Sequence, residues 1–364
     1  MSTEERQGSH VFTAILCTYN RPTLMKEAVA ALRRQTYQNM EIILINNGGT
    51  PETIEHLNDV AASDSRVKLV NFEENVYSDD DPAKYVDVCF NAALEIATGD
   101  YVWCQSDDDF LADDYAERMV TLFIDNPECT SAAGLPVSVD VNSELNDTGP
   151  RDTNFRPRYM PGHLLAIDHV RGKSTMFGAP GYVFTVKREE LIKAGGFRQP
   201  IEYAHMYGIV PFGVTGFDEE AIAYWRHHDG QLNKDATNRG LIGAYETFKL
   251  FKDWQIGRRW QVLGGDMGGQ LVAAMEREQC LKAANWITMY LYSGQLSAAL
   301  YLTRTMWRHP QFWVRTPAKA VRRAFSITPI RLALRPIIRL GFQVIPGLAS
   351  LSPQFSRLRE KVDR

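Results

Sequence analysis

Residues 101–110, YVWCQSDDDF, join an apolar run to three consecutive carboxylates. The first five residues, YVWCQ, have the continuous apolar character of a buried β-strand. Asp107, Asp108 and Asp109 follow directly at its end. Neighbouring carboxylates repel one another, and an unpaired buried carboxylate is very costly. The negative charge at the end of this strand therefore needs compensation by other groups or by a bound cation.

The elements that precede this strand alternate regularly along the chain. Three further runs predict strands, and the segments between them have the period of amphipathic helices. The strands are expected at residues 11–17, 40–45 and 67–72, and the helices at Thr23–Gln35, from Pro51 with Thr50 as its cap, and from Asp81-Pro82 to Ala97. Continuous apolar strands that alternate with helices predict an α/β fold, with a mostly parallel sheet covered by helices on both faces.

Three polar loops follow strands of this predicted sheet. They are TYNRP (18–22), NNGGT (46–50) and QSDDDF (105–110). Ligands of such sheets bind outside the carboxyl ends of the strands. The order of elements therefore places Tyr19, Asn46, Asn47 and the three aspartates on one rim of the sheet.

The chemistry of this rim favours a hard divalent cation. Clustered carboxylates select Mg²⁺, Mn²⁺ or Ca²⁺, and a metal held by few protein carboxylates shares its other positions with substrate phosphates. The chain has no dinucleotide-binding GxGxxG, no P-loop and no EF-hand spacing. A nucleotide diphosphate is thus the expected ligand. The alternative is a solvated turn that caps the next helix, although Asp113-Asp114 already marks the start of that helix at Tyr115.

Composition divides the chain into two parts. Its 364 residues, 45% hydrophobic and 23% charged, are typical of globular proteins, and about residue 240 the strand signals give way to helical ones. We expect one domain at residues 10–240 and a helical C-terminal region at 241–364. The uncharged stretch 283–303 is long enough to span a bilayer, but its central SGQ favours a hairpin of two helices.

The C-terminal end is strongly basic. From Arg304 to Arg364 there are 13 Lys or Arg and two acids, so this tail carries about +11 and the rest about −15. Arginines surrounding an apolar helical face, as in AKAVRRAF (318–325), suit an anionic membrane surface. Packing of the tail on the acidic body is the alternative. No nucleic-acid module is recognisable, so no nucleic acid is expected as a partner.

The cysteines and the first ten residues indicate the cellular compartment of the protein. Five cysteines without regular spacing indicate reduced thiols, and MSTEERQGSH (1–10) has no apolar signal core. We therefore expect a cytoplasmic protein that associates peripherally with the cytoplasmic face of the membrane through its tail.

At this point the motifs match a known family. The N-terminal half resembles family 2 glycosyltransferases of the GT-A fold, in the order and spacing of AILCTYNRP, EIILINNGGT, FNAALEIATGDYV and QSDDDF, the last at the position of the DXD motif. Weaker similarity continues in YVFTVKREELIKAGGF (182–197) and AIAYWRHHDGQLNK (221–234). The resemblance covers roughly residues 10–240.

The resemblance implies an inverting transfer of a sugar from a nucleotide-diphospho-sugar, with UDP as the expected nucleotide, to a hydroxyl of a glycan or lipid-linked acceptor in surface polysaccharide assembly. It implies Mn²⁺ or Mg²⁺ as cofactor, held by Asp107, Asp109 and His228. The implied nucleotide-sugar-binding residues are Thr18, Tyr19, Asn20, Arg21, Asn46, Asn47, Asn91, Asp107 and Asp108.

The sequence departs from the family pattern at three places. Asn46 stands where a carboxylate is usual, and Phe90 stands where arginine is frequent, so Lys84 or Arg21 would have to supply the cationic contact. The family's acidic pair after the GGF turn is absent. Glu202 is the expected catalytic base, with Asp218 or Glu219 as its rivals. These departures leave open a non-catalytic sugar-nucleotide-binding or scaffold protein on the same fold; a nucleotidyltransferase would need a basic triphosphate loop that the sequence lacks.

Overall fold

A computed structural model describes residues 9–77, 84–145, 157–170, 184–198 and 201–228, together with positions 287, 299, 300, 303 and 304. At Val170, Glu202 and Tyr203 it describes the backbone alone. Nearly all of the predicted C-terminal region, with Cys280 and the basic tail, lies outside these residues, so the expected division at residue 240 stays a prediction. Within the described ranges, no helix has the length and apolar character needed to cross a bilayer.

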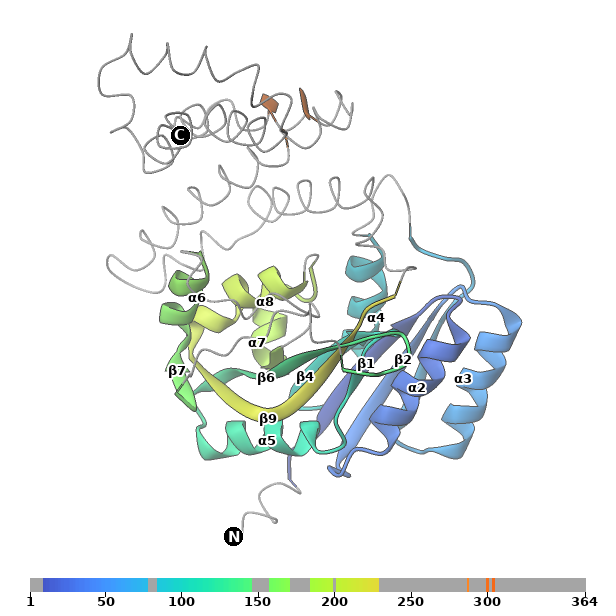
Figure 1. Cartoon of the computed structure of the whole chain (residues 1–364), viewed down its shortest axis with the longest axis horizontal. Helices are drawn as coiled ribbons and strands as arrows, with labels where there is room; N and C mark the ends of the chain where they lie inside the picture. Colours follow the sequence, from blue (N-terminus) through green and yellow to red (C-terminus); the bar gives the residue numbers. More distant parts are fainter. Residues whose placement is uncertain are drawn as a thin grey trace, which may run out of the picture. The chain divides into compact units, whose positions relative to one another are not determined.

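The first half of the fold is a parallel sheet, as predicted. Strands β1 (Phe12–Thr18), β2 (Met40–Asn47), β3 (Val67–Phe72) and β4 (Tyr101–Ser106) lie side by side in the order β3-β2-β1-β4 (Figure 1). Thr18 pairs with Asn46 and Cys17 with Ser106, so the ends of β1, β2 and β4 lie at the same level. The loops that follow these strands therefore share one rim.

The second half extends the same sheet with mixed strand directions. Beyond β4 come β8 (Phe184–Lys187), β6 (Cys129–Val139), β9 (Val214–Arg226) and β5 (Phe110–Leu111), while β7 (Tyr159–Pro161) pairs with β9. β8 is antiparallel to both β4 and β6, whereas β9 runs parallel to β6. β9 curves across the sheet in Figure 1 and ends beside the loop that follows β4.

Helices cover both faces of the sheet. One face of β1 and β2 packs on α2 (Pro22–Arg33), α3 (Pro51–Ser63) and α5 (Tyr115–Asp125) in one apolar core. The π-helix η1 (Val86–Phe90) contacts β1 and β2 and continues into α4 (Asn91–Ile96). The remaining helices are α6 (Gly162–Val170), α7 (Arg188–Lys193), α8 (Ile201–Gly208) and the 3₁₀ turn η2 (Val210–Phe212).

Local details of the helices differ from the sequence-based expectation. Thr50 precedes α3, but its side chain makes no capping hydrogen bond to the helix backbone, and its hydroxyl lies 3.2 Å from that of Thr53. The helix expected from Asp81-Pro82 has its start outside the described residues, and its central turn is π-helical. The four described cysteines are buried and free, as expected.

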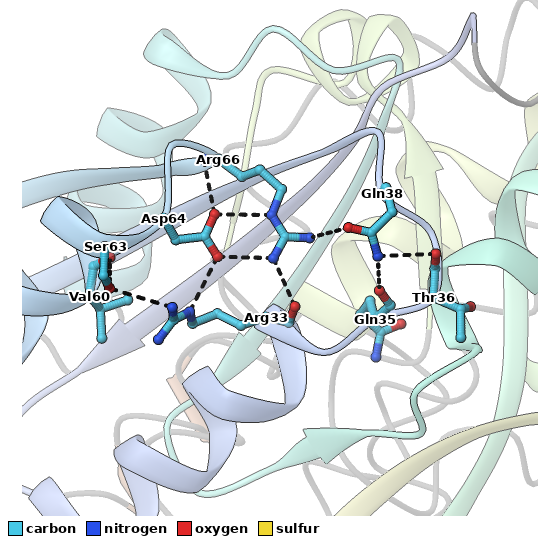
Figure 2. Close-up of polar contacts among 8 residues, drawn as sticks. All are labelled: Arg33, Gln35, Thr36, Gln38, Val60, Ser63, Asp64 and Arg66. Carbon is cyan, nitrogen blue, oxygen red and sulfur yellow. Dashed lines mark hydrogen bonds and ion pairs between the residues drawn. The ribbon is translucent and has the colours of Figure 1, made fainter.

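A network of ion pairs joins the ends of α2 and α3 (Figure 2). The Asp64 carboxylate accepts hydrogen bonds from Arg66 Nε at 3.0 Å and Arg66 Nη2 at 2.9 Å, and from Arg33 Nε at 3.2 Å. Arg66 Nη2 also donates to the carbonyl oxygen of Arg33. The hydrogen bonds from Arg66 hold the pKa of Asp64 well below its usual range, because they favour the charged form.

Replacement of Asp64 by asparagine should lower the free energy of unfolding by about 1–3 kcal/mol, since it removes hydrogen bonds between charged groups. Because the pKa of Asp64 is depressed by folding, its contribution is complete above the unfolded pKa and is lost as pH falls through the folded pKa. Urea unfolding should therefore show a difference between wild type and Asp64→Asn at pH 7 that shrinks below about pH 4. A difference independent of pH would contradict the assigned role.

Candidate functional site

The three consecutive aspartates form the connection between β4 and β5, here called the acid loop (Asp107–Asp109). All three residues are buried, with 4%, 8% and 8% of their surfaces exposed. The loop lies at the rim of the parallel strands, as predicted, since β4 ends level with β1. Each carboxylate has different partners, and these come from three parts of the chain.

Asp107 is bound by the loop that follows β1. Its Oδ2 accepts a hydrogen bond from Thr18 Oγ1 at 2.7 Å and one from the main-chain N–H of Tyr19 at 3.3 Å. Arg21 Nη1 lies 3.3 Å from its Oδ1. Burial raises the pKa of Asp107 to about 6; the charge of Arg21 opposes this rise, and the charge of Asp108 adds to it.

Asp108 lies between two cationic or ionisable side chains. Its Oδ2 is 3.2 Å from Arg21 Nη1 and 3.1 Å from His228 Nε2. His228 follows the end of β9, so this contact joins residues 120 positions apart. The structure thus brings Thr18, Tyr19, Arg21 and His228 together around two members of the acid loop.

Asp109 is directed to a different partner. Its Oδ1 accepts the main-chain N–H of Arg226 at 3.0 Å, and its carbonyl oxygen accepts Gln105 Nε2. Burial raises the pKa of Asp109 well above its usual range, and the charge of Asp108 adds to the rise. Of the expected ligands Asp107, Asp109 and His228, the described contacts join His228 to Asp108 of the same loop.

The loop after β2 is shaped by its two asparagines. Asn46 Oδ1 accepts the N–H of Gly49, and Asn47 Oδ1 accepts the N–H of Val76. Asn47 Nδ2 donates to Asn75. A Cβ atom on Gly48, whose φ is +69°, would lie 2.2 Å from the nitrogen of Asn75, so this position requires glycine.

The loops after β1 and β2 are joined directly. Asn20, at φ 51°, accepts the N–H of Thr50 through its side-chain oxygen at 2.7 Å. This local geometry turns the chain at the end of β1 and leaves Tyr19 42% exposed. Tyr19 is the member of the predicted set that presents an accessible aromatic ring at the rim.

Asn91 has a different environment from the rest of the predicted set. Its amide donates to the carbonyls of Asp87 and Phe197 and accepts the N–H of Phe197. It thereby ties the start of α4 to the predicted GGF turn, where Gly196 has a φ of +83°. The described contacts do not join Asn91 to the acid loop.

The three candidates for the catalytic base lie in different environments. Glu202 lies in α8, and its side chain is outside the described residues. Asp218 lies in β9, eight residues before Arg226, and forms an ion pair with Arg118 of α5 at 3.4 Å. Glu219 is exposed in the same strand. The pairing with Arg118 gives Asp218 a structural role.

A divalent cation fits the chemistry of the acid loop. Across the described side chains, no three His, Cys, Asp or Glu groups are arranged to hold a metal ion. A cation that shares its coordination with substrate phosphates does not need three protein ligands. Burial is the main cause of the raised pKa values of Asp107 and Asp109, so a bound cation, like a proton, would offset the cost of these buried carboxylates. Hard carboxylate oxygens suit Mg²⁺ or Mn²⁺.

Four residues of the site were not predicted from the sequence. Arg226, Glu27 and Ser143 form a linked set of hydrogen bonds behind the acid loop, and Gln105 supports Asp109 from within β4. Arg226 precedes two histidines in WRHH (225–228), and this cluster could have marked it as a site residue. No sequence pattern connects it with Glu27 or Ser143.

Comparison with known proteins agrees with this architecture. Residues 13–179 match the family model of Glycosyl transferase family 2. An uncharacterized glycosyltransferase of Haemophilus influenzae is 33% identical over 116 residues, which cover 32% of this chain and 43% of that protein. The putative glycosyltransferase EpsH of Bacillus subtilis is 26% identical over 135 residues, 37% of this chain and 35% of that protein. The chain thus spans less than half the length of these curated relatives.

Among solved structures, residues 1–349 of S. aureus TarS in complex with UDP-GlcNAc align with a TM-score of 0.50 and 13% identity. The alignment covers 82% of this chain and 92% of that one. The sheet therefore has the GT-A fold. Residues 13–179, just under half of the chain, are more particularly similar to family 2 glycosyltransferases.

Burial of Asp107 has a measurable effect on stability. Folding raises its pKa to about 6, so the wild type loses stability as pH rises from about 4 to about 6 and stays at the lower level above. Asp107→Asn keeps an oxygen for Thr18 and Tyr19 without the buried charge. In EDTA at pH 7.5, the free energy of unfolding of the variant should exceed that of wild type by about 1–3 kcal/mol. The advantage should vanish below about pH 4; a variant less stable than wild type at pH 7.5 would contradict it.

Proposed function

We propose that the protein is a metal-dependent inverting glycosyltransferase. It moves a sugar from a nucleotide-diphospho-sugar to a hydroxyl of a glycan or lipid-linked acceptor in the assembly of a surface polysaccharide. The observation that carries the proposal is the meeting of Thr18, Tyr19 and Arg21 with the acid loop at the rim of a family 2 domain. S. aureus TarS, which shares the fold, was solved with UDP-GlcNAc.

The nucleotide would bind between the loops after β1 and β2. The exposed ring of Tyr19 is suited to stack on a base. Asn46 offers an amide where relatives have a carboxylate, and Asn20, Asn47 and Asn75 hold the two loops in shape. Thr18 and Asp107 lie beside these two loops and would contact the ribose and the diphosphate. Asn91 would act indirectly, through the turn that it fixes at Phe197. UDP is the donor nucleotide that we propose.

The acid loop with His228 would hold Mn²⁺ or Mg²⁺. Asp107, Asp109 and His228 remain the proposed ligands, and Asp108 would orient His228. When bound, the cation would stabilise the negative charge that develops on the leaving diphosphate. Arg21, 3.2–3.3 Å from Asp107 and Asp108, would supply a second positive charge close to the same phosphates.

The reaction requires a base that takes the acceptor proton. The acceptor oxygen forms a bond to the anomeric carbon as the bond to the diphosphate oxygen breaks, and the proton passes to the base. We propose Glu202 of α8 for this role, because it follows the GGF turn as the family's acidic pair does. Asp218 is less suited, since it is paired with Arg118.

The setting of the reaction is also part of the proposal. A lipid-linked acceptor would lie at the cytoplasmic face of a membrane, and the basic tail would attach the enzyme there peripherally. This rests on the charge of residues 304–364 alone.

Metal-dependent donor binding tests the site directly. Calorimetry with UDP and with a panel of UDP- and GDP-sugars should show binding that requires Mn²⁺. Asp107→Ala and Asp109→Ala should weaken it by more than roughly 10–100-fold, since that is the usual effect of losing only an outer partner of a metal site. Asp113→Asn, an exposed carboxylate paired with Arg34, is the matched control and should bind as wild type does. Binding that is unchanged in EDTA would refute the metal dependence.

Glu202 and Asp218 can be separated by kinetics. Glu202→Gln should keep donor affinity and reduce sugar transfer by roughly 10²–10⁴-fold, the contribution typical of a general base. Asp218→Asn should keep both donor affinity and turnover. Full turnover by Glu202→Gln would transfer the role to another carboxylate, and nucleotide binding without transfer to any acceptor pool would favour a non-catalytic protein.

A further inference from the structure

The last residue of β9, Arg226, is the largest fully buried side chain in the part of the chain that the structure describes, with 1% of its surface exposed. A buried guanidinium is costly unless it is paired and hydrogen-bonded. Since Arg226 lies directly behind the acid loop, its partners show what this buried charge does.

On one side Arg226 contacts three consecutive residues, two of the acid loop and the first residue of β5. Its main-chain N–H donates to Asp109 Oδ1 at 3.0 Å, and its Nε donates to the carbonyl oxygen of Asp108 at 2.9 Å. The guanidinium also lies over the ring of Phe110, 5.0 Å from the ring centre. The backbone and the side chain of Arg226 thus fix the acid loop together.

On the other side Arg226 is anchored to two distant segments. Nη2 donates to Glu27 Oε2 of α2 at 2.7 Å, and Nη1 donates to Ser143 Oγ at 2.8 Å and to the carbonyl of Val141 at 3.1 Å. Ser143 Oγ in turn donates to Glu27 Oε1 at 2.8 Å. Arg226, Glu27 and Ser143 therefore form a closed ring, here called the arginine anchor.

We propose that Arg226 is a positioning residue for the donor site, and that the arginine anchor sets the geometry of the acid loop. The proposal rests on the proposed function. Two residues after Arg226, His228 contacts Asp108. Because Arg226 binds the carbonyl oxygen of Asp108 and precedes His228 by only two residues, it fixes the main chain near both members of the Asp108–His228 pair. Buried as it is, Arg226 acts through these groups and not on the substrate.

If Arg226 only stabilised the fold, its mutation would lower the free energy of unfolding without a local effect on the acid loop. Arg226→Lys keeps the charge but loses the fork that reaches Asp108, Glu27 and Ser143 at once. Glu27→Gln, whose side chain is 39% exposed, loosens the anchor and leaves Arg226 in place. Arg66→Lys, in the Asp64 network of Figure 2, is the matched control.

Two measurements on the full chain test the proposal. Hydrogen exchange followed by mass spectrometry should show faster exchange in peptides covering residues 104–111 and 224–228 in Arg226→Lys and, to a smaller degree, in Glu27→Gln. Calorimetry with UDP and Mn²⁺ should show a dissociation constant raised roughly tenfold in Arg226→Lys, the effect of losing an outer partner of a metal site. Arg66→Lys should change neither.

The outcomes are distinguishable. Unchanged exchange in the acid loop, or equal effects of Arg66→Lys, would overturn the proposal. Faster exchange with unaltered UDP affinity would also overturn it, because the loop geometry would then not matter for the donor. If wild type binds no nucleotide while exchange still rises in the variants, the proposed function fails and the positioning of the loop stands. If Arg226→Lys does not fold, Glu27→Gln and Ser143→Ala decide the same question.

Discussion

Burial of three consecutive carboxylates at the end of β4 is the constraint on which the site depends. Each aspartate must find partners within a sheet rim, and no partner lies nearby in sequence except Gln105. Thr18, Tyr19 and Arg21 come from the loop after β1, while Arg226 and His228 come from the end of β9, more than 110 residues later. The acid loop can form only when both halves of the sheet have assembled.

The charges at this rim bear directly on the proposed cation. Among the described side chains in direct contact, Arg21 and Arg226 face four carboxylates, those of the acid loop and Glu27. Burial is the main cause of the raised pKa values of Asp107 and Asp109, and the charge of Asp108 adds to both. A divalent cation would balance the excess negative charge, and a diphosphate could then approach without repulsion. Arg21 thus compensates the negative charge of the loop only in part.

How far the sequence predicts this site follows from its topology. The rim could be predicted because parallel strands with continuous apolar residues bring the loops after β1, β2 and β4 to one level. The different partners of the three aspartates could not be predicted. Those of Asp108 and Asp109 include residues at and after the end of β9, whose course depends on the mixed second half of the sheet. For the same reason Asn91, placed by motif at the site, is bound to the turn at Phe197. The helix cap expected at Thr50 does not form, and the Thr50 hydroxyl lies instead 3.2 Å from that of Thr53.

The asparagines at the end of β2 complete the electrostatic argument. Asn46 and Asn47 are 1% and 3% exposed, and Asn46 stands beside Thr18, the partner of Asp107, in the sheet register. A carboxylate at position 46 would add a further buried negative charge to a rim that already carries more carboxylates than cations. An amide supplies both a donor and an acceptor without that charge. The negative charge of the site is therefore concentrated in the acid loop, where a cation can neutralise it, while the loop after β2 contributes shape and neutral hydrogen bonds.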